Sequence, residues 1–319
     1  MVNRGAIKNM GLNKMNRKAM FFTVSAIILL SLLLISLTFY SAVQDKNAIN
    51  KRVDTLNNFI FSTDKDIQRK LYISGFRVIF LFEKRIVEEG SYISDLHGTF
   101  QEAFFNGTIY SESQELMNGA MFSDIVQAIN EKAGKINADV ELSNPNVAIS
   151  QDDPWEVKIT LTGNMQIYDP PNAIFFNRTL NISGIVPVMG FEDPIYLLST
   201  NGKISNKINK SVYSNFVSGN DVSNLSLHSQ NSYYIASIMA PSFLDRLEGN
   251  FSANPNGIES LVYLPELSAQ GIAVNEKSNV DYIYFSSNNP TSYHIKFMPA
   301  WFRIDNDHLN IYQVSGLTE

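Results

Sequence analysis

The chain has 319 residues, of which 45% are apolar and 18% charged, and a formal net charge of −6. This length allows one membrane anchor plus one large or two small domains, and the apolar share excludes a mainly disordered chain. The sequence contains no cysteine, which excludes structural disulfides, zinc–thiolate sites and thiol nucleophiles.

Charge is distributed unevenly along the chain. No acidic residue precedes Asp45, whereas five basic residues do: Arg4, Lys8, Lys14, Arg17 and Lys18. The part from Asp45 onward therefore holds 20 basic and 31 acidic residues, a net charge of about −11. A domain of that sign repels phosphate backbones, so we expect no nucleic-acid partner. We predict that residues 1–18 form a basic cytoplasmic tail that is attracted to an anionic inner leaflet.

Residues 19–44 form an uncharged, mostly apolar run. As a helix its 26 positions would span roughly 39 Å, enough to cross a bilayer core of about 30 Å. The alternative is a cleaved secretory signal. Such signals have a shorter apolar core and small residues before the cleavage site, whereas here Tyr40 precedes Ala42. The sequence therefore predicts a single-pass protein of the cell membrane, with the lipid bilayer as a partner, a cytoplasmic N-terminus and an extracellular C-terminal domain.

The next predicted element is a helical stalk over residues 45–90, continuous with the membrane helix. Apolar residues recur at helical spacing from Ile49 to Leu81, and Gly90 stands where a C-terminal cap belongs. Two interpretations remain open for its apolar stripe. The part from Ile49 to Ile60 could be a seam for self-association, and the apolar run Val78–Phe82 favours burial against the chain's own head domain.

Residues 91–319 are predicted to form an α+β head, mainly of antiparallel strands, with a subdivision near residues 205–232. A helix is expected to open at Ser123 and another over Phe243–Leu247, ending at Gly249. Alternation predicts strands in several stretches, and Asn201-Gly202 predicts a tight hairpin after Ile195–Ser199. The stretches are residues 136–142, 155–161, 180–188, 280–286, 293–298, 301–304 and 309–314, the last two joined by a turn at Asp305–Asp307. Residues 205–232 are polar and predict a long surface loop or interdomain connection.

Candidate chemistry is weak throughout the head. The four histidines, His97, His228, His294 and His308, lack paired spacing, so solvated histidines are the better interpretation than metal ligands. The stretch Asp305–His308 resembles a calcium loop only superficially, and turn chemistry explains it better.

Two acidic pairs, Asp152-Asp153 and Glu192-Asp193, are adjacent residues that point in opposite directions on an extended chain. They therefore predict no glycosidase-type dyad. We identify no catalytic, cofactor-binding or metal-binding residue from the sequence and expect no cofactor and no enzymatic activity.

N-linked glycans are predicted partners of the head, because six asparagines match the acceptor pattern. They are Asn106, Asn177, Asn181, Asn209, Asn224 and Asn250. Aromatic pairs such as Tyr233-Tyr234 and Phe175-Phe176 could stack on sugars, but aromatic residues at strand spacing more often belong to a core.

The opening of the chain resembles a known type of N-terminus. Lys18-Ala19 leads directly into the apolar helix, followed by an amphipathic stalk and a β-rich head, as in archaeal type IV pilin-like proteins. That resemblance implies processing after Ala19. The wider chain, including the stretches 153–157, 193–196 and 257–262, is similar to archaeal membrane-anchored surface proteins, which implies a location and an architecture but no activity.

Two functions from different classes follow. The first is a membrane-anchored cell-surface protein with a structural, adhesive or pilus-like assembly role. The alternative is an extracytoplasmic ligand-binding or hydrolytic domain whose site forms only in the tertiary structure.

Overall fold

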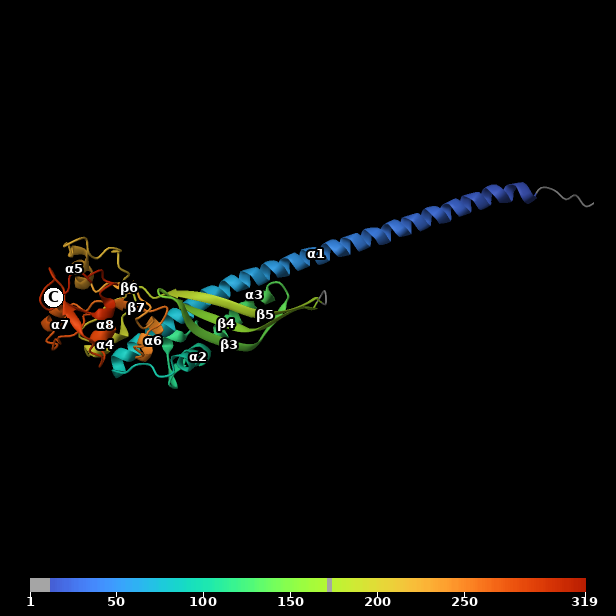
Figure 1. The fold of residues 1–319 in the computed structure, drawn as a ribbon. Coiled ribbons are helices and arrows are strands. Elements are labelled where there is room, and N and C mark those ends of the chain that lie inside the picture. The colour runs from blue at the N-terminus through green and yellow to red at the C-terminus, as the bar shows by residue number, and fades with distance from the viewer. Residues whose placement is uncertain (1–11, 171–173) are drawn as a thin grey trace, which may run out of the picture. The chain divides into compact units, whose positions relative to one another are not determined.

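The computed structural model describes residues 12–170 and 174–319. Most of the predicted basic tail therefore lies outside the described residues. The chain divides into two compact units, Met1–Ser62 and Thr63–Glu319, and the division falls inside the predicted stalk. Figure 1 shows the helices and strands that make up these units.

The first described element is α1 (Leu12–Glu89), a single helix that contains both the apolar run and the predicted stalk. From Met20 to Val43 its large apolar side chains are exposed, for example Leu29 at 67% and Leu30 at 62%. The hydroxyl groups of Ser31 and Thr38 donate to backbone carbonyls of their own helix, so they add little cost in an apolar medium. This segment is long and apolar enough to cross a membrane.

The second unit contains a three-stranded antiparallel sheet in the order β3-β4-β5, drawn in green and yellow in Figure 1. Its strands are β3 (Asp139–Asp153), β4 (Glu156–Asp169) and β5 (Ile174–Pro187). The predicted alternation is confirmed in β4, where Val157, Ile159 and Leu161 are buried. Strand β3 carries a register shift between Ser143 and Asn146, which moves its buried side chains to Val147 and Ile149.

One face of the sheet packs on the second half of α1. A Cβ on Gly184 of β5 would lie 2.6 Å from the backbone nitrogen of Tyr72, and one on Gly75 of α1 would lie 2.6 Å from Ile159. Only glycine allows this close approach. The apolar run Val78–Phe82 is buried at Val78, Ile79, Leu81 and Phe82, as the interpretation of burial in the head predicts.

Helices α2 (Leu96–Asn106) and α3 (Phe122–Gly134) complete this part of the unit. The predicted helix at Ser123 is confirmed as α3, whose buried face carries Ile125, Ile129 and Ala133. Gly90 has the left-handed conformation expected of a C-terminal cap, with φ +65°. Between α2 and α3 lie three short elements, β1 (Thr108–Ile109), β2 (Glu112–Ser113) and η1 (Glu115–Met117).

The remaining elements, which run from yellow to red in Figure 1, are short helices and two-stranded ladders. The helices are α4 (Pro194–Ser199), α5 (Ser223–Gln230), α6 (Phe243–Glu248), α7 (Leu264–Ala269), α8 (Asp281–Tyr284) and η3 (Asn306–His308). The ladders pair β6 (Tyr234–Ala236) with β7 (Ile258–Ser260), and β8 (Ser292–His294) with β9 (Arg303–Asp305). The predicted helix at Phe243 is confirmed as α6, capped by Ser242 and ended by Gly249 at φ +71°.

Four predictions for this region are wrong. The hairpin at Ile195–Ile204 is the helix α4, because the Asp193 side chain accepts a hydrogen bond from the Ile195 N–H and Pro194 occupies the first turn. Asn201 and Gly202 end that helix, with the Gly202 N–H donating to the Leu197 carbonyl at 2.7 Å.

The strand predicted over 280–286 is the helix α8, and the chain turns irregularly from Leu309 to Val314 instead of forming a strand. The fourth error concerns the interpretation of residues 205–232 as a surface loop. They are not simply a surface loop, because they contain α5 and bury Ile208, Phe216 and Leu225. The overall prediction is nevertheless confirmed: a long apolar N-terminal helix is followed by an α+β head with antiparallel strands.

Candidate functional site

The densest group of polar side chains in the described structure is buried in the C-terminal half of the second unit. Six ionisable residues there are at most 1% exposed: Asp193, Arg246, Glu259, Asp281, Asp305 and His308. They come from the start of α4, from α6, β7 and α8, and from the turn after β9. We call this group the buried charge network.

Arg246 is the centre of the first half of the network. Its Nη1 donates to Asp193 Oδ2 at 2.5 Å and to Asp281 Oδ2 at 3.1 Å, and its Nη2 donates to Asp281 Oδ1 at 3.2 Å and to the Ile258 carbonyl. One side chain of α6 is thereby bonded to the N-cap of α4, to β7 and to α8. Such a link can replace a disulfide in holding short elements together.

The two carboxylates of this half have further donors. Asp193 accepts from the Tyr234 hydroxyl at 2.6 Å, and Asp281 accepts from the backbone and hydroxyl of Ser260 at 2.9 and 2.8 Å. Burial lowers the pKa of Arg246, but the carboxylates of Asp193 and Asp281 more than offset it, so the pKa is raised and the guanidinium stays charged. Burial raises the pKa of Asp193, and Arg246 opposes that shift.

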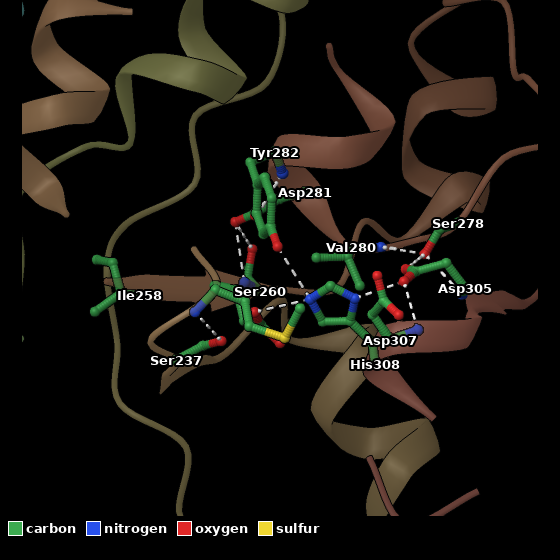
Figure 2. Close-up of polar contacts among 12 residues, drawn as sticks. Ser237, Ile258, Ser260, Ser278, Val280, Asp281, Tyr282, Asp305, Asp307 and His308 are labelled. Carbon is green, nitrogen blue, oxygen red and sulfur yellow. Dashed lines mark hydrogen bonds and ion pairs between the residues drawn. The ribbon is translucent and has the colours of Figure 1, made fainter. Parts of the chain in front are cut away.

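His308 is the centre of the second half, which Figure 2 shows between Tyr282 and Asp305. Its Nδ1 lies 2.7 Å from Asp305 Oδ1, and its Nε2 lies 3.1 Å from the Tyr282 hydroxyl and 3.3 Å from Glu259 Oε2. Burial lowers the pKa of His308, but hydrogen bonds and charge from Asp305 and Glu259 outweigh it and raise the pKa to about 10. The ring is therefore an imidazolium at neutral pH, held between two carboxylates.

The geometry of His308 does not suit catalysis. Both ring nitrogens face protein groups, Nδ1 towards Asp305 and Nε2 towards Tyr282 and Glu259, so neither is open to a substrate. The hydroxyl of Ser278 donates to Asp305 Oδ2 at 2.6 Å and so is not placed as a nucleophile against the imidazole. Since the network residues are almost completely buried, a substrate could not reach them without local opening. The arrangement is that of a structural crosslink.

The sequence-based interpretation of the histidines is half right. His97 is exposed and His294 is half-buried, but His228 and His308 are buried, so the interpretation as solvated residues is wrong for those two. Within residues 12–170 and 174–319, no group of three or more histidine or acidic residues is arranged to hold a metal ion. Turn chemistry at Asp305 is confirmed, because its Oδ1 accepts from the Asp307 N–H at 3.2 Å.

The other candidates take different positions. Asp152 and Asp153 are exposed at the end of β3, whereas Asp193 belongs to the network. Tyr234 is a core residue, and Phe175 is 58% exposed on β5. All six asparagines of the glycan acceptor pattern are exposed, so the fold leaves each of them accessible to modification.

The sequence analysis did not identify Arg246, Glu259 and Asp281. Arg246 and Asp281 could have been recognised, because each is a charge within an apolar pattern. Arg246 stands between Phe243 and Leu247 on the apolar face of a short helix, and Asp281 interrupts the apolar run from Val280 to Phe285. A charge at a position that the pattern marks as buried indicates a buried partner.

Glu83 of α1 is a further buried ionisable residue, and Asp193 of the network is among the charges that act on it. Glu83 is 6% exposed, and its Oε1 has no hydrogen-bond partner. Burial raises the pKa of Glu83 to about 9, although the Glu192 N–H opposes the shift. The carboxyl group is therefore protonated at neutral pH.

Comparisons with protein-family models, with curated proteins and with solved structures give no match for this chain. The function must therefore be argued from its own residues.

Proposed function

We propose that the protein is a membrane-anchored cell-surface protein whose α+β unit has a structural, adhesive or pilus-like assembly role without enzymatic activity. The observation that carries the proposal is the apolar segment of α1, whose large side chains from Met20 to Val43 are exposed. An aqueous surface does not tolerate a continuous apolar segment of that length, whereas a bilayer does.

The orientation that we propose follows from charge. Basic residues precede the segment and acidic ones follow it, so the N-terminus is cytoplasmic and the α+β unit is extracellular. The six exposed acceptor asparagines and the absence of cysteine are compatible with that side of the membrane.

Support for a non-enzymatic role comes from the buried charge network. It is the only place in the described residues where so many ionisable groups meet below 2% exposure, and its geometry is that of a crosslink. Removal of one partner from such a buried pair is strongly destabilising, which is the behaviour expected of a structural crosslink.

The absence of cysteine makes the topology directly measurable. We would introduce single cysteines as Asn3→Cys and Asn224→Cys and treat intact cells with a membrane-impermeant maleimide. The expected result is labelling at Asn224→Cys in intact cells, and labelling at Asn3→Cys only after lysis. Equal labelling of both variants in intact cells would contradict the proposal.

A second measurement separates the anchored and pilus-like branches of the proposal. Mass spectrometry of the native N-terminus would give a chain that begins at Met20 if the pilin-like site after Ala19 is processed. An intact basic tail would favour a permanently tethered protein, and self-association through residues 49–60 would then need its own test by crosslinking in the membrane.

A further inference from the structure

A groove lies between the second half of α1 and α3, within the second unit. Its cavity volume is about 240 Å³, and its floor is apolar, formed by Ile67 of α1 and by Ile125, Ala128 and Ile129 of α3. At its open side Ile73 is 38% exposed. An apolar floor of this kind favours a ligand with a hydrocarbon portion.

The rim of the groove is basic. Lys132 and Arg69 both face the same carboxylate, Asp66, the second at 4.0 Å, and Lys70 donates only to the Gly119 carbonyl at 3.4 Å. Two of these three cations thus share one acid, and the acceptor of the third, Lys70, is an uncharged carbonyl. The chain from Asp45 onward carries about −11, so this excess of positive charge runs against the sign of its surroundings. It favours an anionic ligand.

The groove also contains an unpaired hydrogen-bonding group. Thr63 lines it at 1% exposure, and its Oγ1 has no hydrogen-bond partner. A helical threonine can bond back to its own helix, and a buried hydroxyl without a partner costs free energy. A polar group of a ligand would remove that cost.

A second hollow continues the first around α1. It has a volume of about 680 Å³, shares Arg69 and Ile73 with the groove, and adds Tyr72 and Ile185. The two hollows together offer an apolar path on both sides of one exposed arginine, whose side chain is 78% exposed. A chain-like molecule with one charged end matches this arrangement better than a compact one.

We propose that the α1–α3 groove binds a free acyl carboxylate, with the hydrocarbon chain on the isoleucine floor and the carboxylate at Arg69, Lys70 and Lys132. Arginine and lysine form charge-assisted hydrogen bonds with carboxylates. Arg69 and Lys132 exchange their shared partner Asp66 for the ligand, and Lys70 exchanges the Gly119 carbonyl. This inference is independent of membrane anchoring, because every residue it uses belongs to the second unit.

The test is photolabelling of the full chain in phosphatidylcholine nanodiscs with a diazirine-bearing analogue of decanoate, mapped by mass spectrometry. We expect labels on α1 between residues 63 and 73 and on α3 between residues 125 and 132. Decanoate should compete, whereas decanol and decylamine should not, because they lack the anionic group. Labels confined to residues 20–43, or equal competition by all three amphiphiles, would overturn the proposal.

The charge requirement has a matched control. Lys132→Glu should reduce the groove labels about tenfold, the loss expected for one charge-assisted bond. Lys158→Glu should leave them unchanged, since Lys158 is similarly exposed (41% against 44%) and is also paired with an aspartate, Asp152, but lies on the sheet. Equal labelling of both variants would overturn the proposal.

Two further variants separate binding from folding. Thr63→Val should weaken labelling several-fold, and Ala128→Trp should remove it by filling the groove, with thermal unfolding of both variants monitored in parallel. If the Ala128→Trp variant unfolds at the same temperature as the native chain and is still fully labelled, the ligand does not bind in this groove. If phosphatidylglycerol in the nanodisc suppresses labelling and decanoate does not, the groove binds a membrane lipid and the proposal of a free carboxylate is wrong.

Discussion

The two units of the chain differ in which side chains they expose and which they bury. In the first unit, α1 exposes Leu29, Leu30 and their apolar neighbours to its surroundings. The second unit does the reverse, because it buries Arg246, His308 and four carboxylates. Exposing apolar surface to water costs free energy, and so does burying a charge that has no partner. The first unit therefore contains a helix that is long and apolar enough to cross a membrane, and the second unit buries its charges in pairs.

The largest effect should come from breaking the buried charge network. Arg246→Met leaves Asp193 and Asp281 buried without a counter-charge, so we expect a loss of about 3–5 kcal/mol in the free energy of unfolding. Both tryptophans, Trp155 and Trp301, lie in the second unit, so denaturant unfolding followed by their fluorescence reports on it alone.

The control for that variant is an exposed ion pair. Arg303→Met removes a partner of Glu276, which is 88% exposed, and should cost less than about 1 kcal/mol. Adding Asp193→Asn and Asp281→Asn to Arg246→Met should restore part of the loss, because the unpaired charges are then removed. An equal cost for Arg246→Met and Arg303→Met would contradict a structural role for the network.

Replacing the buried acid Glu83 of α1 should stabilise the protein, whereas replacing Arg246 should destabilise it. The pKa of Glu83 is raised from 4.5 to about 9 in the folded state, so its contribution to stability is full below pH 4.5 and is lost as the pH rises toward 9. Glu83→Gln keeps the shape without this loss, and at pH 7 it should be more stable than the native chain by roughly 3 kcal/mol.

The diagnostic measurement for Glu83 is the pH dependence of unfolding. The native chain and Glu83→Gln should approach equal stability near pH 4.5 and diverge steadily toward pH 9. Glu88→Gln, at an exposed position one turn further along the helix, should follow the native curve. Parallel native and Glu83→Gln curves would show that the carboxyl group is ionised in the folded state.

Low pH should lower the stability of the second unit, because protonation of the buried His228 is unfavourable in the folded state. Burial lowers the pKa of His228 to about 3, its Nε2 has no partner, and its ring lies 4.8 Å from that of Phe216. Stability from this residue is therefore complete above pH 6.5 and falls as the pH drops toward 3, by about 2 kcal/mol at pH 5. His228→Phe should remove this contribution to the acid slope, and an unchanged slope in that variant would contradict the assignment.

The smallest predicted effect tests the contact of the sheet with α1. A methyl group on Gly184 would lie 2.6 Å from the Tyr72 nitrogen, so Gly184→Ala should cost about 1–2 kcal/mol through overpacking. Gly316→Ala is the control, since a methyl group there meets nothing within 4 Å. If both variants unfold at the same denaturant concentration, the sheet does not approach α1 this closely.

The sequence predicted those elements whose local pattern agrees with their tertiary role. The membrane-length helix, α3 and β4 each carry one clear periodicity, and α6 has both a Ser242 cap and Gly249 at its end. The error at α4 had a different cause. Its Asn201-Gly202 pair occurs equally in tight hairpins and at helix ends, and the Asp193-Pro194 start was the signal that distinguished them.

The candidate site was harder to predict because its residues meet only in the folded chain. Asp193 and Asp281 are 88 positions apart in sequence and converge on the same nitrogen of Arg246, Nη1, with no spacing rule that connects them. The groove is likewise formed by Ile67 of α1 and Ile125 of α3, which a sequence pattern marks only as core positions. Both side chains are at most 1% exposed, and only the folded arrangement of α1 and α3 places them under one groove.

The central claim, that the apolar part of α1 anchors the protein in a membrane, is tested most directly by alkaline carbonate extraction of membranes. The native chain should stay in the membrane pellet, and a chain lacking residues 19–44 should move to the supernatant with the same tryptophan-monitored unfolding curve. A native chain that is released by carbonate would contradict the account.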